Sequence, residues 1–278
     1  MCEDGWGGKN CSVALIGCNQ NRCQNGGNCV PWLVGEDDHR YNCTCLPGFD
    51  GQFCQHRTTF SLSGDSYIKV PSTRAEGYEL HMKFRTTLGN GLLAIGQANT
   101  LFRLQLLNGK LNLYSNLVSR YDGITIGENL NNTEWQKVYV AVNATHLTLG
   151  VNDRLQNNEP INPNGDSDTV FYNTFFGGID SDQQILARNA PNFTGCMQDI
   201  IVDGMKITEE DFLEGGERDV EEVNTSPDCI RKEQCKPNPC HNNGICKDLW
   251  NSFQCTCHRP FLGPSVRFFV LQFSSSLI

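Results

Sequence analysis

Cysteine spacing constrains the fold of this chain more than any other feature. Fifteen cysteines occur in 278 residues, crowded at the two ends and absent from 55 to 195. One run has gaps of 4, 5, 13, 1 and 8 residues, and a later run has gaps of 4, 5, 8 and 1. The runs are Cys18, Cys23, Cys29, Cys43, Cys45 and Cys54, then Cys235, Cys240, Cys246, Cys255 and Cys257. Such repeated spacing indicates small cysteine-stapled modules at both ends.

The number of thiols limits the compartment in which the chain can fold. They are held either by disulfides outside the cell or by zinc inside it. The closest pairs, Cys43 with Cys45 and Cys255 with Cys257, are separated by one residue, whereas zinc modules usually leave about two to four. Six Asn-x-Ser/Thr sequons also favour secretion. They begin at Asn10, Asn42, Asn131, Asn143, Asn192 and Asn224.

Charge and motif content exclude several classes of function. The formal net charge is −9 and no lysine or arginine cluster is evident, which argues against nucleic acid and, more weakly, against sulfated polyanions. The six histidines are scattered, and no nucleophile elbow, phosphate loop or His-Glu-x-x-His motif occurs. We therefore predict that the protein is not an enzyme and has no catalytic residue. No apolar run approaches the roughly 20 residues of a membrane span, so membrane attachment would need parts of a longer parent chain.

The segment between the cysteine-rich ends shows the alternation of β-strands. Apolar residues recur at every second position in 78–84, 102–106, 138–142 and 147–151. Asn108-Gly109 separates two such runs, and both residues tolerate the positive φ of a tight hairpin turn. Short strands with Asn/Gly turns and no long helical pattern predict an antiparallel β-sandwich.

The cysteine runs resemble the epidermal-growth-factor-like (EGF-like) module. We assign 14–55 to one complete module, 1–11 to the end of a preceding one and 231–265 to a truncated third. A chain this short cannot bury enough apolar surface, so bridges replace a core, although spacing alone does not fix the pairing. The resemblance implies the pairs Cys2–Cys11, Cys18–Cys29, Cys23–Cys43, Cys45–Cys54, Cys235–Cys246 and Cys240–Cys255.

Residues 56–230 resemble a laminin G-like domain. The resemblance rests on Trp135 before a central strand, on the Phe175-Phe176-Gly177-Gly178 run and on Gly195-Cys196. It implies that Cys196 pairs with Cys229. The expected fold class is therefore all-β: a laminin G-like antiparallel sandwich (jelly-roll) flanked by small disulfide-rich EGF-like modules.

Alternation of these two modules resembles Crumbs, neurexins, agrin, Slit and the Fat cadherins, and several stretches look like Crumbs. These include residues 84–91, 106–113 and 195–199. The resemblance implies an extracellular interaction segment of an apical transmembrane protein of epithelial polarity, which contacts proteins including its own kind. The alternative is a calcium-dependent glycan- or ligand-binding laminin G-like module of a matrix or neurexin- or agrin-like protein.

Calcium is the only cofactor that the sequence suggests. Calcium-binding EGF-like modules use oxygen ligands around the first cysteine and after the third. Gln234 and Asp248 match two of these positions, but Arg231 stands where an acidic residue is expected, so Glu233 would have to substitute for it. Some laminin G-like domains hold calcium at the sandwich rim. The loop aspartates available for that are Asp122, Asp166, Asp168, Asp180 and Asp182.

Glycosylation is expected at four of the six sequons, which fall in predicted loops or strand ends. These are Asn131, Asn143, Asn192 and Asn224. Asn10 and Asn42 lie directly beside cysteines that we expect to be bridged, so we predict that they are poorly accessible.

The last cysteine run lacks its sixth member, because Val266 stands where the spacing places a cysteine. The preceding Cys257 is therefore expected to be unbridged and reactive. Residues 266–278 form a tail unlike the module. Val266-Arg267 can be encoded by GTAAGA, a typical intron start, so we expect read-through of an unspliced exon or a gene-model error.

Overall fold

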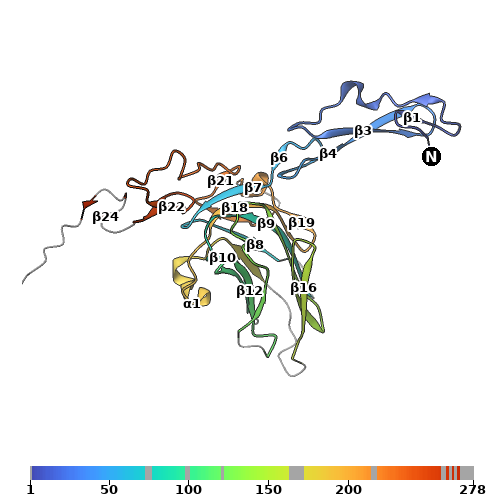
Figure 1. Ribbon diagram of the computed structural model, residues 1–278. Helices are drawn as coiled ribbons and strands as arrows, with labels where there is room; N and C mark the ends of the chain where they lie inside the picture. The colour runs from blue at the N-terminus through green and yellow to red at the C-terminus, as the bar shows by residue number, and fades with distance from the viewer. Residues whose placement is uncertain are drawn as a thin grey trace, which may run out of the picture.

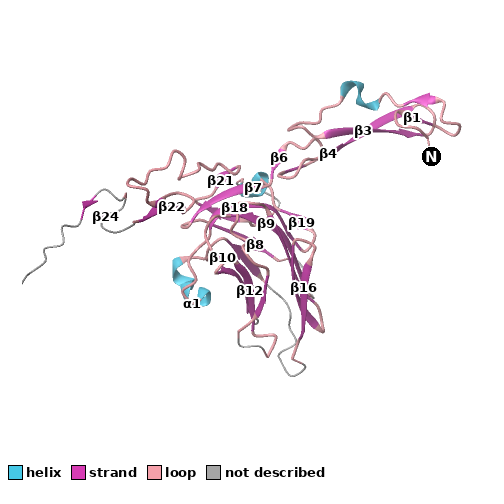
Figure 2. Cartoon of the chain, in the orientation of Figure 1, coloured by secondary structure: helices cyan, strands magenta, loops and turns pink. Residues whose placement is uncertain are grey.

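The computed structural model describes residues 2–72, 77–97, 101–119, 122–162, 172–213, 218–257, 261–262, 265 and 268–269. A two-sheet sandwich lies between an elongated N-terminal arm and a short C-terminal arm (Figure 1). Strands dominate (Figure 2). The described helical segments are short: η1 Gly17–Gln20, η2 Ser181–Gln183, α1 Gln184–Ala187 and η3 Glu209–Phe212. None of them is long and apolar enough to span a bilayer. The predicted all-β class is confirmed.

One sheet of the sandwich has seven strands in the order β13-β12-β11-β10-β17-β8-β20. Neighbours pair antiparallel throughout. The strands are β8 Tyr67–Pro71, β10 Gly91–Gln97, β11 Leu101–Leu107, β12 Lys110–Ser115, β13 Ile124–Ile126, β17 Asn173–Phe176 and β20 Glu221–Val223.

The other sheet has eight strands, in the order β16-β15-β14-β9-β18-β7-β21 with β19 paired to β18. The strands are β7 Thr59–Ser63, β9 Tyr78–Arg85, β14 Gln136–Val142, β15 His146–Val151, β16 Leu155–Pro160, β18 Thr194–Val202, β19 Met205–Lys206 and β21 Ser226–Pro227. The central strands β9 and β18 lie far apart in sequence, so this sheet forms only when distant segments meet.

The alternating runs become the strands that they predicted. In β9 the residues Tyr78, Leu80, Met82 and Phe84 are buried and the residues between them face outward, as a half-buried strand requires. Asn108 and its glycine neighbour adopt φ values of 51° and 74° in the turn between β11 and β12, which is the backbone form of a tight hairpin.

Aromatic and aliphatic side chains from both sheets fill the space between them. Phe84 of β9 and Phe193 lie edge to face with ring centroids 6.1 Å apart, a favourable arrangement of their quadrupoles. Gly177 has a φ of 79°, and a side chain there would collide with Leu62. The glycine that follows the Phe-Phe pair is therefore required by both backbone conformation and packing.

The arms consist of two-stranded ladders. In the N-terminal arm β1 Trp6–Gly7 pairs with β2 Val13–Ala14, β3 Asn28–Val34 with β4 Asp38–Thr44, and β5 Phe49–Asp50 with β6 His56–Arg57. In the C-terminal arm β22 Ile245–Asp248 pairs with β23 Phe253–Thr256, and β24 Phe261–Leu262 with β25 Phe268–Phe269.

Seven disulfides staple the fold. They join Cys2–Cys11, Cys18–Cys29, Cys23–Cys43, Cys45–Cys54, Cys196–Cys229, Cys235–Cys246 and Cys240–Cys255. Cys257 belongs to none of these bridges. Val266, and most of the tail for which we expected an unspliced exon, lie outside the described residues.

Candidate functional site: an outer-face groove beside the N-terminal joint

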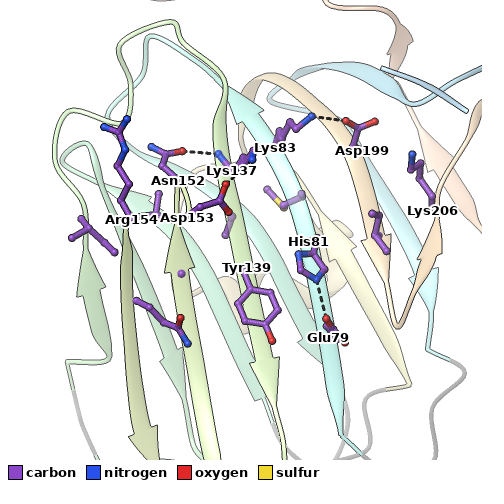
Figure 3. A pocket seen from close by; sticks show the side chains of 17 residues that line it. Glu79, His81, Lys83, Lys137, Tyr139, Asn152, Asp153, Arg154, Asp199 and Lys206 are labelled. Carbon is purple, nitrogen blue, oxygen red and sulfur yellow. Dashed lines mark hydrogen bonds and ion pairs between the residues drawn. The ribbon is translucent and has the colours of Figure 1, made fainter. Parts of the chain in front are cut away.

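A groove with a volume of 790 Å³ crosses the outer face of the eight-stranded sheet (Figure 3). Its floor is formed by alternate residues of β9 and β14, because the residues between them point into the core. Gly150 of β15 lies opposite Tyr139 in the register, so no side chain fills the space beside the phenol ring. We refer to this feature as the groove.

The floor carries an aromatic pair and a carboxylate. The rings of His81 and Tyr139 lie 4.7 Å apart, and His81 Nε2 lies 2.9 Å from Glu79 Oε1. Partial burial, with Glu79 nearby, raises the pKa of the Tyr139 hydroxyl, so the phenol stays protonated and can donate a hydrogen bond. His81 falls on the polar side of the alternation in 78–84, but that pattern gives no sign that a ring on the next strand pairs with it.

The groove is richer in basic side chains than the chain as a whole. Lys137 pairs with Asp153 at 2.6 Å on the rim, and Lys83 pairs with Asp199 at 2.7 Å. The basic lining residues Lys83, Lys137, Arg154 and Lys206 outnumber the acidic Glu79, Asp153 and Asp199, whereas the whole chain has a net charge of −9. Arg154 is exposed and makes no ion pair within the described ranges. Since the three lysines face carboxylates, Arg154 is the basic lining side chain that can attract an acidic group.

Asp199 fixes the joint between the N-terminal arm and the sandwich. It lies in a β-bulge of β18, where the register with β9 shifts between Gln198 and Ile201, and its φ is 51°. Its Oδ1 accepts hydrogen bonds from Thr58 Oγ1 at 2.7 Å and from the backbone N–H of Gly48 at 3.3 Å. Since its Oδ2 accepts from Lys83, one bulged residue connects the arm with the groove.

Further contacts between polar and charged side chains surround that joint. Lys206 lies 3.7 Å from Asp50 in the arm, and His56 lies 3.1 Å from Glu210. Arg57 contacts Glu209 at 3.3 Å. Exposed pairs of this kind contribute little individually, but together with the Asp199 hydrogen bonds they fix the direction of the arm.

Arg231, two residues after the bridged Cys229, is held against the hairpin of the C-terminal module. Its Nη2 donates to Asp248 Oδ2 at 2.9 Å, and its guanidinium lies 5.2 Å from the centroid of the Trp250 ring. The Gln234 backbone N–H donates to the same carboxylate oxygen at 3.0 Å, and the Trp250 N–H donates to Asp248 Oδ1 at 2.8 Å. Trp250 is 3% exposed, so it packs within the C-terminal module and offers no contact surface.

The residues predicted to bind calcium do not fit a divalent cation. Both oxygens of Asp248 accept hydrogen bonds from protein donors, one of them cationic. Glu233 pairs with Lys236 at 2.7 Å, and that hydrogen bond lowers the pKa of the Glu233 carboxyl. Gln234 turns its side-chain Nε2 to the Lys232 carbonyl at 3.1 Å. Among the described residues no group of three or more His, Cys, Asp or Glu side chains could hold a metal ion.

The rim aspartates within the described ranges belong to no group that could hold a metal ion either. Asp122, Asp180 and Asp182 are exposed, and Asp166 and Asp168 lie outside the described residues. Calcium binding by this chain remains a prediction, and the contacts of Asp248 argue against it at the C-terminal module.

The four predicted glycan acceptors differ in exposure. Asn143 and Asn224 are exposed, whereas Asn131 and Asn192 are half-buried. The Asn131 side-chain amide donates to the Thr87 carbonyl at 3.1 Å, which leaves Asn143 and Asn224 as the more accessible pair. Glycosylation at all four remains a prediction.

Comparisons with known proteins agree with this architecture. Residues 84–205 match the laminin G domain family, and residues 18–53 and 235–264 match the EGF-like domain family. Human Protein crumbs homolog 2 is 34% identical over 250 residues, which cover 85% of this chain and 18% of that protein. Mouse Protein crumbs homolog 1 is 30% identical over 257 residues, covering 84% of this chain and 18% of that protein. The chain thus spans less than a fifth of these relatives.

A solved structure shows the same fold. The LG1-3 region of the laminin alpha2 chain superposes with a TM-score of 0.52 at 14% identity, over 72% of this chain and 38% of that one. At this identity the similarity concerns the fold and not the ligand.

Proposed function

We propose, since this chain belongs to the Crumbs-type proteins built from EGF-like and laminin G-like domains, that its groove binds a protein partner outside the cell. The chain is an extracellular interaction segment composed of binding modules. The observation that supports this site is the basic, aromatic-floored groove on an otherwise acidic chain. The Asp199 contacts hold the groove in one orientation relative to the N-terminal arm.

A second copy of the ectodomain is the partner that the net charge favours. The chain carries a net charge of −9, so the part outside the groove is net acidic and complements the exposed Arg154. Complementary charges mainly accelerate association and select partners. We place this contact at the apical surface of epithelial cells, where the whole parent protein would serve in apical-basal polarity.

Bead aggregation with the purified, secreted chain tests this function. Tyr139→Ala removes the aromatic floor and Arg154→Glu reverses the exposed charge, so the double variant should lose homophilic aggregation. Arg22→Glu makes the same charge change in the N-terminal arm and should aggregate like the parent. Aggregation should also weaken as salt rises. Unchanged aggregation of the double variant would exclude the groove as the contact site.

The same preparation distinguishes the alternative function. Retention on matriglycan-coated beads in calcium, with release by a chelator, would indicate a calcium-dependent glycan-binding module. Failure to bind those beads, together with self-aggregation in chelator, would support protein contact through the groove.

A further inference from the structure

The hairpin of β3 and β4 has one covered face and one open face. Cys29, Tyr41 and Cys43 belong to the half-buried face, where Tyr41 Oη accepts a hydrogen bond from the Arg22 N–H at 3.1 Å. The opposite face carries Val30, Trp32 and Val34, which are 44%, 38% and 40% exposed. We call these three side chains the apolar stripe.

Asn42 lies beside the apolar stripe. In the register Asn42 is directly opposite Val30, and Arg40 is opposite Trp32, which places Asn42 diagonal to the indole. Directly paired side chains lie about 5 Å apart and diagonal ones about 7–8 Å. Asn42 is exposed and its side chain makes no hydrogen bond within the described residues.

The cysteine that follows Asn42 does not block this sequon. Successive side chains of a strand point to opposite faces, so Cys43, bridged to Cys23, lies on the covered face. Asn42 and Thr44, the two residues that define the sequon, share the open face, where both are exposed. We predicted that Asn42 would be poorly accessible because it adjoins a bridged cysteine. The strand geometry instead leaves Asn42 accessible.

We propose that Asn42 carries an N-linked glycan whose first sugars cover the apolar stripe. The Asn42 amide nitrogen bonds to the anomeric carbon of an oligosaccharide donated by a lipid-linked pyrophosphate. The bond between that carbon and the pyrophosphate oxygen breaks, the lipid pyrophosphate leaves and the amide releases one proton. This modification is independent of what the groove binds and requires only that the chain enters the secretory pathway.

The location gives the glycan a structural role. A two-stranded hairpin exposes unpaired edges, and an apolar face beside them favours association with other chains. A sugar ring has an apolar C–H face that can pack on an indole, which offers a large rigid surface. Arg40 helps to hold that indole, because its guanidinium lies 5.8 Å from the Trp32 ring centroid and pairs with Asp38 at 2.7 Å.

Another exposed sequon, at Asn143, provides a contrast. Asn143 is also exposed, but its Oδ1 accepts hydrogen bonds from the Thr145 N–H at 2.9 Å and the His146 N–H at 2.8 Å. Its neighbours are polar, so a glycan there has no apolar stripe to cover.

Peptide mapping of the full chain secreted from mammalian cells tests occupancy. After enzymatic deglycosylation, position 42 should be read as Asp. Thr44→Ala should remove this glycan, whereas Thr44→Ser preserves the sequon and should retain it. An unmodified Asn42 in the secreted chain with the Cys23–Cys43 bridge intact overturns the proposal.

Binding of a fluorescent hydrophobic dye tests whether the glycan covers the stripe. Asn42→Gln should increase dye fluorescence severalfold, and adding Trp32→Ser should remove that increase. Asn143→Gln should leave fluorescence unchanged. Equal dye binding by the parent and Asn42→Gln chains would show that the glycan does not cover the stripe.

Discussion

The guanidinium of Arg231 lies 2.9 Å from Asp248, on the carboxylate that calcium-binding modules of this kind would present to the ion. The two side chains are only 13% and 17% exposed. A fixed positive charge thus lies on the carboxylate that would otherwise face a divalent cation, within the C-terminal module. Removing either partner would leave a largely buried charge without compensation.

We therefore expect the C-terminal module to be insensitive to calcium. The melting temperature of the parent chain should be the same in calcium and in chelator. Arg231→Asp supplies the missing acidic ligand and should melt lower in chelator but recover with added calcium. Arg22→Asp, an exposed change, should show no calcium response. A calcium-dependent rise in the parent chain would refute this assignment.

Asp199→Asn should loosen the N-terminal joint. The substitution keeps a side-chain oxygen but leaves Lys83, 21% exposed, without its counter-charge. We expect a loss of about 1–3 kcal/mol in unfolding free energy, together with faster proteolysis between the arm and the sandwich. Asp153→Asn is the control, because the Lys137–Asp153 side chains are 57% and 76% exposed. Asp153→Asn should lower the unfolding free energy by about 0–1 kcal/mol. An equal loss in both variants would contradict the special role of Asp199.

The pairing of β20 with β8 should weaken in acid. Hydrogen bonds from Tyr67 Oη and Lys69 Nζ lower the pKa of the Glu221 carboxyl. A depressed carboxyl pKa stabilises the fold above its unfolded value of about 4.3 and loses that effect as pH falls through the folded pKa.

Glu221→Gln should accordingly lower the melting temperature slightly at neutral pH, by an amount that vanishes below the folded pKa. The loss of unfolding free energy should be within about 1 kcal/mol, because the Glu221 side chain is 47% exposed. Melting curves over a pH series, with Glu36→Gln as control, measure it. If Glu221→Gln lowers the melting temperature equally in strong acid, the loss does not come from the ionised Glu221 carboxylate.

Gly177→Ala should destabilise the sandwich more than the same change at Gly204. Both glycines have positive φ, 79° and 85°, so each alanine incurs backbone strain of about 1–3 kcal/mol. A methyl group at Gly204 meets nothing within 4 Å, whereas at Gly177 it collides with Leu62. Urea unfolding of both variants compares them directly. Equal midpoints would mean that the core at Leu62 adjusts freely.

The local features of this fold could be predicted because they depend on neighbouring residues. Alternation at Tyr78, Leu80, Met82 and Phe84 predicted β9, and Asn108-Gly109 predicted the turn after β11. Both succeeded because strand periodicity and positive-φ preference act over a few residues. The groove could not be predicted in this way, since His81 and Tyr139 meet only through the register between β9 and β14.

The sequence by itself determined the all-β class, the cysteine-stapled modules and the strands of the sandwich. Cysteine spacing, alternation and turn preference each depend on residues that are close together in the sequence. Only the tertiary structure decided what the exposed and charged residues do. Lys83 and Asp199 are 116 positions apart and meet at a bulge, while Arg231 reaches Asp248 across a folded module. Asn42 faces solvent because strand pairing turns its bridged neighbour to the opposite side. Contacts between distant segments depend on register and packing, which no local pattern specifies.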